Sequence, residues 1–469
     1  MIRPLRLFAV ATVLLLSACA TSAPRVTPEL PFELPQAFDS TLERSDSDEP
    51  WYHEFEDDRL EALIAEAFIA NPTLDAAWAR LEQAQARATI AGADALPRAG
   101  FAAGAQRSRN QFFAPGFGPQ VNRVTTHSLS FDVSWEIDLW GRIRAGQSAA
   151  ITDAEQAAVA YDGARLSLSG QIANAYFAAT TRALILELAR QDYGSVRDLA
   201  STIERRFKEG LRPALDYRLA LADLGNAESR RAEAFRDHEI ALRQLETLLA
   251  RYPEGRIAVG QDLPAPVRTV PSVLPTDLLW RRPDLVESER ALAAAGARTR
   301  EARRALLPRI SLSGSGGTVS EDLADILDLD FSVWTIAANL SQPIFEGGRL
   351  RANVDLAASR EEEQQARFVE VALRAFSEVE RALATEGALA RREEALANVV
   401  ENTRTALEIS EARYLQGVVS IVDLLQTRRS YYTARTQHLL ARLERLTHRV
   451  DLHLALGGGF ESPDAEGQP

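Results

Sequence analysis

The chain contains one pattern of residues twice, and this repetition limits the folds open to it. The stretch Glu204–Asp216 (ERRFKEGLRPALD) matches Glu411–Asp423 (EARYLQGVVSIVD) at five positions, each 207 residues from its counterpart. Earlier in each half, a pair of prolines 25 residues apart also recurs, here with an offset of 211. An ordered series of matches is typical of internal duplication. The difference between 211 and 207 places four additional residues in the first half, between about 99 and 140, where a loop can absorb them.

Both halves favour very long helices. Residues 150–209 are rich in alanine, leucine, glutamate and arginine and contain no proline. Such a segment favours a helix of roughly 90 Å at 1.5 Å per residue. Apolar residues recur every seven positions before each repeat of the pattern, a spacing typical of coiled coils. Shorter helices are expected over 58–71, 73–95 and 283–305.

Gly210 and Gly417 interrupt the two long helices at equivalent points. Glycine readily adopts the left-handed conformation that ends a helix, so each break predicts a hairpin of two helices. Asp216 and Asp423 follow near the first turn of the returning helix, where a carboxylate complements the helix dipole. We interpret both aspartates as capping residues. The duplication places both turns at the same end of the molecule.

A strand with one apolar face is predicted over residues 129–139. Apolar side chains there alternate with serine, aspartate and glutamate, and a period of two is typical of a strand. Partner strands are expected over 99–108 and 309–318. A half-buried soluble sheet would show the same alternation, but the length matches the about 9–11 residues of a membrane-spanning strand. The predicted lipid-facing residues are Leu129, Phe131, Val133, Trp135 and Ile137 in the first half and Trp334, Ile336 and Leu340 in the second.

Four strands per chain cannot close a barrel by themselves. An open sheet edge in hydrocarbon leaves backbone groups unpaired, at a cost of several kcal/mol each, so other chains must complete the barrel. Two chains would supply eight strands, and a barrel of that size is filled by its own side chains. Three chains would supply twelve strands and leave a lumen. This geometry favours a trimeric tube.

The N-terminus predicts export and a lipid anchor. Arg3 and Arg6 precede a short apolar run, and LSAC follows at residues 16–19. This pattern is typical of a secretory signal peptide, and the run is too short for a membrane span. Cys19 is the only cysteine, so disulfides within the chain are excluded. We interpret Cys19 as the acylated residue of a bacterial lipobox rather than as an incidental cysteine, and Ala20 resembles the next residue of lipoproteins sorted to the outer membrane.

Prolines mark the segments outside the repeats. Five prolines fall between 253 and 275, and another five fall between 24 and 50. Proline at this density disfavours both helices and sheets. The expected organisation is a signal peptide (1–18), a lipid-anchored extended segment (19–58), the first repeat (59–252), a linker (253–276), the second repeat (277–457) and a disordered tail (458–469).

The composition argues against several classes of function. A formal net charge of −13 and a pI near 5.2 disfavour binding to nucleic acid. His448 and His453 are five residues apart, so a helix directs them to different faces, and no zinc or haem spacing occurs. The glycines of 314–317 lack the spacing and the lysine of a phosphate-binding loop. We therefore predict that the protein is not an enzyme and binds no cofactor or metal.

Several motifs together resemble one known family. They are the lipobox, WYHEFEDDRLEALIAEAFIANPTL, LPTDLLWRRPDL, LPRISLSGSGG, QPIFEGGRLRANV and ARYLQGVVSIVDLLQTRRSYY. In this order they resemble the outer-membrane factor (TolC-like) family, and most closely its efflux lipoproteins of the NodT/OprM-like group. The resemblance covers nearly the whole mature chain. It implies a mixed α and β, mostly α fold: a homotrimeric tube with a twelve-stranded outer-membrane barrel, continued by a long periplasmic α-helical coiled-coil barrel.

The resemblance also implies a function and partners. Members of this family are the exit ducts of tripartite efflux pumps. We therefore expect an outer-membrane location with a large periplasmic part, contact with outer-membrane lipid, and two protein partners. These partners are a periplasmic membrane-fusion adaptor and an inner-membrane transporter, often of the RND type.

Specific tip residues follow from the same resemblance. Gly210 and Gly417, with Arg206 and Arg413 beside them, match the periplasmic tips that meet the adaptor.

Pore closure is assigned to the same region. Tyr414 matches a tyrosine that bonds an aspartate of the other hairpin, here Asp216. Asp423 matches an acidic ring at the constriction, which three chains would build as a cation site. Two positions depart from the family: Gln426 replaces a further acidic residue, which weakens the ring, and Val419 replaces an arginine of the closing network.

Two alternatives remain open from the residues alone. A duct for type I protein secretion would have the same features, because the inner-membrane partner selects the cargo. A periplasmic coiled-coil adaptor or scaffold lipoprotein would also contain long helical hairpins. Such a scaffold would not need the lipid-facing residues Trp135 and Trp334.

Overall fold

A computed structural model describes residues 21–28, 30–32, 50–114, 116, 118–265 and 275–458. The signal peptide, Cys19 and residues 459–469 of the predicted tail lie outside this part of the chain. No helix within it is long and apolar enough to cross a membrane.

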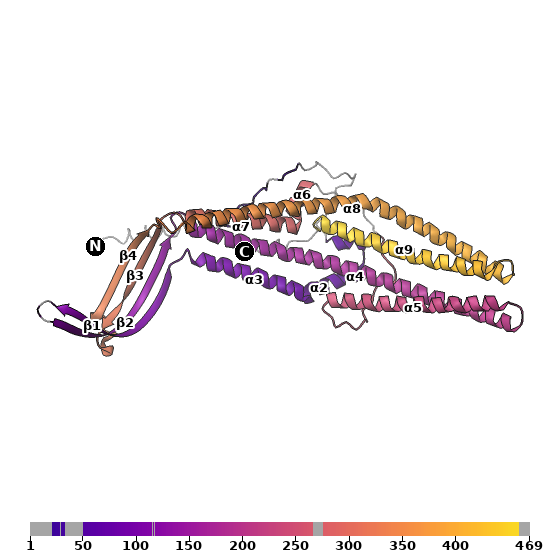
Figure 1. Ribbon diagram of the computed structural model, residues 1–469, viewed down its shortest axis with the longest axis horizontal. Coiled ribbons are helices and arrows are strands. Elements are labelled where there is room, and N and C mark those ends of the chain that lie inside the picture. The colour runs from indigo at the N-terminus through magenta and orange to yellow at the C-terminus, as the bar shows by residue number, and fades with distance from the viewer. Residues whose placement is uncertain are drawn as a thin grey trace. The chain divides into compact units, whose positions relative to one another are not determined.

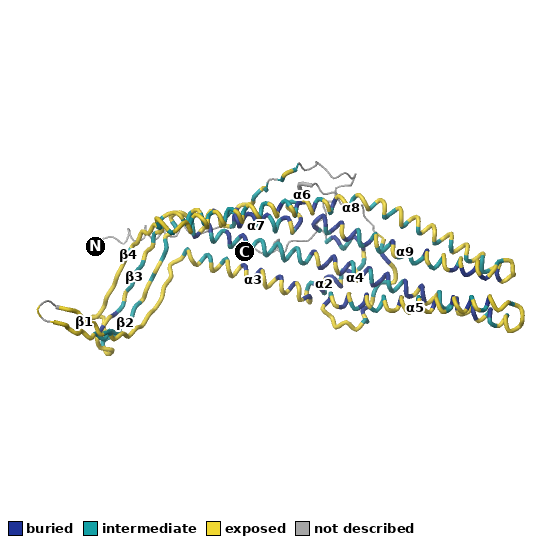
Figure 2. The backbone as a smooth tube through the Cα atoms, viewed as in Figure 1, coloured by how far each residue is buried: buried dark blue, intermediate teal, exposed yellow. Residues whose placement is uncertain are grey.

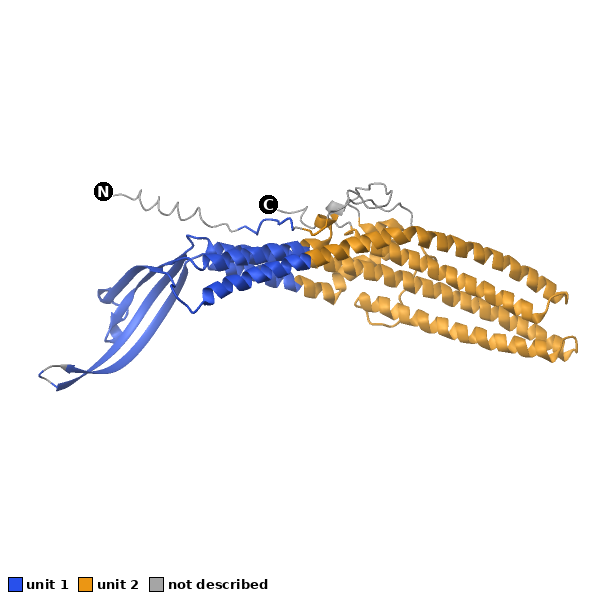
Figure 3. Cartoon of the chain, turned by 45° about the horizontal axis from the view of Figure 1, so that its top comes forward, with its two compact units in different colours: residues 1–29, 79–158, 287–368 blue, residues 30–78, 159–286, 369–469 orange. Residues whose placement is uncertain are grey.

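The chain forms two compact units, which are coloured separately in Figure 3. Each unit draws on both sequence repeats, so the compact units do not follow the boundaries of the duplication. Unit 1 comprises 1–29, 79–158 and 287–368, and unit 2 comprises 30–78, 159–286 and 369–469.

The helices of the two halves agree in length. The two longest helices have 67 residues each, and the helices that return from them have 35 each. The first half contains η1 (Trp51–Phe55), α2 (Asp58–Ala70), α3 (Pro72–Ala93), β1 (Arg98–Ala114), β2 (Gly118–Ile137), α4 (Arg142–Lys208) and α5 (Ala214–Leu248). The second contains α6 (Pro275–Arg281), α7 (Pro283–Arg304), β3 (Arg309–Ser320), η2 (Leu323–Asp325), η3 (Leu329–Phe331), β4 (Ser332–Ser341), α8 (Arg349–Leu415) and α9 (Ile421–Ala455).

Four details differ from the sequence-based expectations. The helix expected over 150–209 begins earlier, at Arg142. The additional residues of the first half lie in longer strands, with 17 residues in β1 and 20 in β2, rather than in a loop. The segment expected to be extended up to residue 58 contains η1, which folds because Trp51 and Phe55 are buried. The helix α6 begins at residue 275, inside the expected linker.

The four strands of unit 1 form one antiparallel sheet in the order β1-β2-β3-β4. Phe101 pairs with Phe131, Phe131 pairs with Gly316, and Gly316 pairs with Trp334. The strands β1 and β4 are the two edges of the sheet. Figure 2 shows that the strands are largely exposed, in contrast to the buried helix faces.

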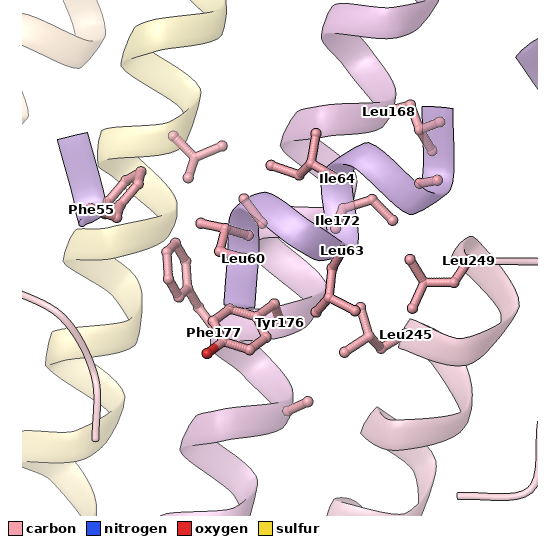
Figure 4. Close-up of a cluster of buried hydrophobic side chains, with 14 of the residues drawn as sticks. Phe55, Leu60, Leu63, Ile64, Leu168, Ile172, Tyr176, Phe177, Leu245 and Leu249 are labelled. Atoms are coloured by element: carbon pink, nitrogen blue, oxygen red, sulfur yellow. The ribbon is translucent and has the colours of Figure 1, made fainter. Parts of the chain in front are cut away.

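The main hydrophobic core belongs to unit 2. It unites η1, α2, α4, α5 and α9, as the close-up in Figure 4 shows for its central side chains. The rings of Phe55 and Phe177 lie 5.0 Å apart. The hydroxyl of Tyr176 donates a 2.8 Å hydrogen bond to Asp57, which also caps α2. Burial of these large side chains fixes the helices from which the two hairpins extend.

A buried ionic cluster attaches η1 to α9. The carboxylate of Glu54 accepts a 2.8 Å hydrogen bond from Nε of Arg449 and a short one from His453. The ring of His453 stacks on Trp51, with 5.8 Å between centroids. Burial favours the neutral acid, but the hydrogen bonds from His453 and Arg449 outweigh it, so the pKa of Glu54 lies below its usual range.

Candidate functional site

The turn between α4 and α5 is closed by a left-handed glycine. Gly210 has φ of +74°, a value that costs glycine little. The Leu211 N–H donates to the Arg206 carbonyl at 2.8 Å, and the Gly210 N–H donates to the Phe207 carbonyl at 2.9 Å. These two bonds form a Schellman motif, the predicted way of ending the helix.

The turn between α8 and α9 repeats this geometry (Figure 1). Gly417 has φ of +77°, and the Val418 N–H donates to the Arg413 carbonyl at 3.0 Å. Ser420 then caps α9: its hydroxyl accepts from the Asp423 N–H at 3.2 Å and donates to the Asp423 carboxylate at 2.7 Å. The capping residue is therefore Ser420, and the interpretation of Asp423 itself as the cap is wrong: its carboxylate accepts from the Ser420 hydroxyl and supports the cap.

Asp216 behaves differently from Asp423. The residue before α5 is Pro213, which offers no side-chain cap, and Asp216 lies in the first helical turn. Its buried carboxylate lies 3.7 Å from Nη1 of Arg212. The interpretation of Asp216 as a capping residue is therefore wrong, and the equivalent aspartates of the two repeats have different partners.

Tyr414 is the central buried residue near the two turns. It is 2% exposed and belongs to an apolar cluster that contains residues of all four hairpin helices. The other buried members are Ala200, Ile203, Ala220, Ile421, Leu424 and Leu425. The two hairpins therefore pack against each other beside their turns, through side chains rather than backbone bonds.

Arg212 connects the two turns. Its guanidinium carbon lies 4.5 Å from the centroid of the Tyr414 ring, within cation–π range. Its Nη2 also donates a 3.0 Å hydrogen bond to the Tyr414 carbonyl. One side chain of the first hairpin therefore contacts both the ring and the backbone of Tyr414 while it faces Asp216.

The predicted Tyr414–Asp216 bond is not formed directly. The buried Tyr414 hydroxyl has no hydrogen-bond partner of good geometry among the described residues. Burial raises the pKa of Tyr414, and the charge of Arg212 opposes this shift; the charge of Asp216 and a weak, poorly aligned hydrogen bond to it add to the rise. Arg212 therefore bridges the two residues that we expected to bond each other.

The remaining predicted tip residues lie on the surface or contribute backbone. Asp423 and Gln426 are exposed on α9, and Arg413 is exposed at the end of α8. Arg206 is partly buried, and its positive charge opposes the rise in the pKa of Tyr414 that burial causes. In the part of the chain that the structure describes, no hydrogen bond or ion pair joins any two of these four side chains.

Sequence reasoning missed Arg212 and Arg428. Arg428 is 7% exposed, and its Nη2 lies 2.5 Å from Glu411, while its Nε and Nη1 have no hydrogen-bond partner in the described chain. A signal for Arg212 was present in the duplication, because its counterpart 207 residues later is Val419. A charged residue at a position where the other repeat is apolar indicates a specialised contact.

The predicted lipid-facing residues share one face of the sheet. Leu129, Phe131, Val133, Trp135 and Ile137 alternate along β2 with polar residues that face the other way. On β4, the side chains of the second set are highly exposed: Trp334 is 76%, Ile336 74% and Leu340 72% exposed. Exposed apolar surface on this scale marks a surface that another phase or partner covers.

The described residues contain no group of three or more histidine, cysteine, aspartate or glutamate side chains that could hold a metal ion.

Both halves of the chain are similar to one known protein family. Residues 63–251 and 274–458 each match the profile of the outer membrane efflux protein family. The chain belongs to the outer membrane efflux protein family. The recognised family is therefore confirmed.

Individual members of the family show how far the similarity extends. The pyoverdine export outer membrane protein OpmQ of Pseudomonas putida is 31% identical over 95% of this chain and 96% of its own length. The structure of the outer-membrane channel OprN superposes with a TM-score of 0.85 at 26% identity, over 94% of this chain and 99% of that one. The open state of the Neisseria gonorrhoeae MtrE outer membrane channel gives 0.80 at 29% identity, over 94% and 99%. The predicted fold class, that of TolC-like outer-membrane channels, is confirmed.

Proposed function

We propose that this protein is the outer-membrane exit duct of a tripartite efflux pump and passes small molecules out of the cell. The main support is that one chain of this family combines an exposed apolar sheet with two long helical hairpins. The related OpmQ is named for export of pyoverdine, a small molecule. This relationship favours small-molecule efflux over protein secretion.

The edges of the sheet support assembly as a trimer. Both β1 and β4 have a free edge within the chain, and a free edge cannot remain unpaired in hydrocarbon. Pairing β4 of one chain with β1 of the next satisfies both edges at once. Three copies supply twelve strands, enough to surround a lumen.

Lipidation and partner binding belong to the same proposal. Acyl chains on Cys19 would attach the N-terminus to the outer membrane. The turns at Gly210 and Gly417 would meet a periplasmic adaptor, which would connect the duct to an inner-membrane transporter of the RND type. Exposed apolar side chains at the turns, among them Leu211 (69%) and Val418 (70%), suit such contacts.

The turns also suit closure of the duct at rest. Arg212 and Tyr414 hold the two hairpins together within a chain. Around a threefold axis, three exposed Asp423 carboxylates would form an acidic ring that concentrates cations. Closure would thus depend on contacts within each chain, and ion selectivity on a ring between chains.

The test is native mass spectrometry of the detergent-extracted full chain from outer-membrane fractions. We expect a trimer with each chain lipidated at Cys19, and Cys19→Ser as the control should lose the lipid mass. A monomer recovered from the soluble periplasm would contradict the duct and support a scaffold role.

A further inference from the structure

The strand pair β1–β2 extends well beyond the other two strands. β2 pairs with β3 only over His127–Ile137, whereas its pairing with β1 continues to Gly118. Residues 106–114 and 118–126 therefore form a two-stranded ribbon without a third strand, visible at the free end of the pair in Figure 1. We call this part of the sheet the ribbon.

One face of the ribbon carries three arginines. Arg107 and Arg109 are two residues apart on β1 and so share a face, and Arg109 pairs directly with Arg123 on β2. Like charges placed directly opposite each other destabilise a strand pair. An arrangement that weakens the isolated chain calls for a compensating partner.

This positive charge has no ion-pair partner in the part of the chain that the structure describes. The sequence has no acidic residue between Asp94 and Asp132, although the chain has a formal net charge of −13. The side chains of Arg107, Arg109 and Arg123 are exposed, and among the described residues none forms an ion pair with a carboxylate. These side chains are therefore available to an anionic partner.

The arginines continue the apolar face of the sheet. Phe101 precedes Arg107 by six residues on β1, so the two side chains lie on the same face, and Phe131 of β2 pairs with Phe101 on that face. Trp334 lies at the level of this pair, because both Phe131 and Trp334 pair with Gly316. Because Phe131 is only six residues from Ile137 at the other end of β2, this aromatic level lies within the about 9–11 residues that a strand needs to cross the hydrocarbon.

The height of the arginines indicates the part of the membrane that they meet. Arg107 pairs with Thr125, which is twelve residues from Ile137 at the other end of β2. Twelve residues span roughly 40 Å along a strand, or about 30 Å along the membrane normal at a tilt of about 35–45°, and this is the thickness of the hydrocarbon core. The arginines of the ribbon would therefore lie at the level of the lipid headgroups and their phosphates.

We propose that the arginine face of the ribbon binds the phosphate groups of anionic lipid headgroups in the outer leaflet. The proposal rests on the proposed function, because it requires the sheet to span the outer membrane. Guanidinium groups bind phosphate by two parallel hydrogen bonds. Arg109 and Arg123, side by side on neighbouring strands, would hold one phosphate between them and so lose their mutual repulsion.

The ribbon contains its own control surface. Ser108, Asn110 and Asn122 lie on the opposite face, where Asn110 pairs directly with Asn122. Their substitution changes the same strands to a similar degree without removing charge. Any effect on folding of the ribbon should appear in both variants.

The rival partner is a second copy of the chain. The connection between β3 and β4 carries five acidic residues and no basic one: Glu321, Asp322, Asp325, Asp328 and Asp330. If β4 pairs with β1 of a neighbour, this connection lies at the arginine-bearing end of that strand. The test must therefore separate lipid binding from contact between copies.

The experiment compares binding of two lipid preparations to the purified full-length protein in nanodiscs. The probes are purified lipopolysaccharide with a phosphorylated inner core and the same material after chemical dephosphorylation. We expect the wild type and the S108A/N110A/N122A control to prefer the phosphorylated form. In R107S/R109S/R123S, the ratio of the two affinities should fall roughly a hundredfold, since each arginine contributes a factor of about five. R107K/R109K/R123K keeps the charge and should retain part of the preference.

Equal binding of both lipid forms by the wild type would overturn the proposal. So would an arginine variant that keeps the preference. If the trimer of the arginine variant dissociates at low salt and its lipid preference is unchanged, the arginines form ion pairs with the acidic connection of a neighbouring copy instead. Failure of the proposed function would appear separately, as absence of the chain from outer-membrane fractions.

Discussion

The guanidinium of Arg212 lies 4.5 Å from the centre of the Tyr414 ring and donates a hydrogen bond to the Tyr414 carbonyl at 3.0 Å. The two residues are 202 positions apart and belong to different repeats. Their counterparts, Val419 and Phe207, cannot form the same contact. The duplication is therefore symmetric in its helices and asymmetric in the contact that joins the two turns.

Loss of this contact should favour opening of the duct. A cation–π contact shielded from water contributes roughly 1–2 kcal/mol, which corresponds to a change of about 5- to 30-fold in a two-state equilibrium. We expect Arg212→Ala to raise the single-channel conductance of the protein in planar bilayers. Arg212→Lys, which keeps the charge but not the planar group, should have a smaller effect. Unchanged conductance in Arg212→Ala would show that Arg212 does not control closure.

The Tyr414 hydroxyl should matter less than the Tyr414 ring. The hydroxyl is buried without a good hydrogen-bond partner, so Tyr414→Phe should leave the melting temperature unchanged or raise it slightly. Tyr414→Ala removes the centre of the apolar cluster and should lower the free energy of unfolding by about 3–5 kcal/mol.

The combined variant Tyr414→Phe with Asp216→Ala tests closure, because it removes the hydroxyl and the carboxylate of the expected bond. A conductance equal to that of the wild type would exclude them from the closing contacts.

The elements of this fold were accessible from the sequence because local preferences and the duplication agree. Proline-free helix formers indicated the long helices, and Gly210 and Gly417 marked their ends. Alternating apolar residues indicated β2. Each of these features depends on residues that are close together in the sequence, so hydrophobic periodicity and helix propensity are sufficient to predict it.

Contacts between distant residues were not accessible in the same way. Arg449 reaches Glu54 across 395 positions, and no local pattern predicts that these groups meet. The ribbon was missed for another reason: its sequence lacks the strict alternation of apolar and polar residues that marked residues 129–139. A strand pair exposed on both faces has no core to impose such a pattern.

The acidic ring at Asp423 predicts block by multivalent cations. If three carboxylates surround the pore axis, a trivalent cation such as hexamminecobalt should reduce conductance at low ionic strength. Asp423→Asn should weaken this block, and Gln426→Glu should strengthen it by adding a second ring one helical turn away. The same cation sensitivity in the wild type and in Asp423→Asn would place Asp423 away from the constriction.

The buried cluster at Glu54 predicts a loss of stability in acid. The pKa of Glu54 is lower in the folded chain than in the unfolded chain. Its ionisation therefore stabilises the fold at pH values above the unfolded pKa of about 4.3, and this contribution is lost as the pH falls through the lower, folded pKa. Hydrogen exchange of residues 51–55 should consequently accelerate below about pH 4, as η1 separates from α9.

Substitution of Glu54 separates this effect from general acid denaturation. Removing one partner of a buried ion pair costs about 3–5 kcal/mol, so Glu54→Gln should lower the melting temperature at pH 7. It should also reduce the difference between the melting temperatures at pH 7 and at about pH 3, which lies below the unfolded pKa, because the titrating carboxylate is gone. The exposed Glu82 has no ion pair among the described residues, so Glu82→Gln should retain the wild-type pH dependence. If Glu54→Gln and Glu82→Gln showed the same pH dependence, the acid sensitivity would arise elsewhere in the chain.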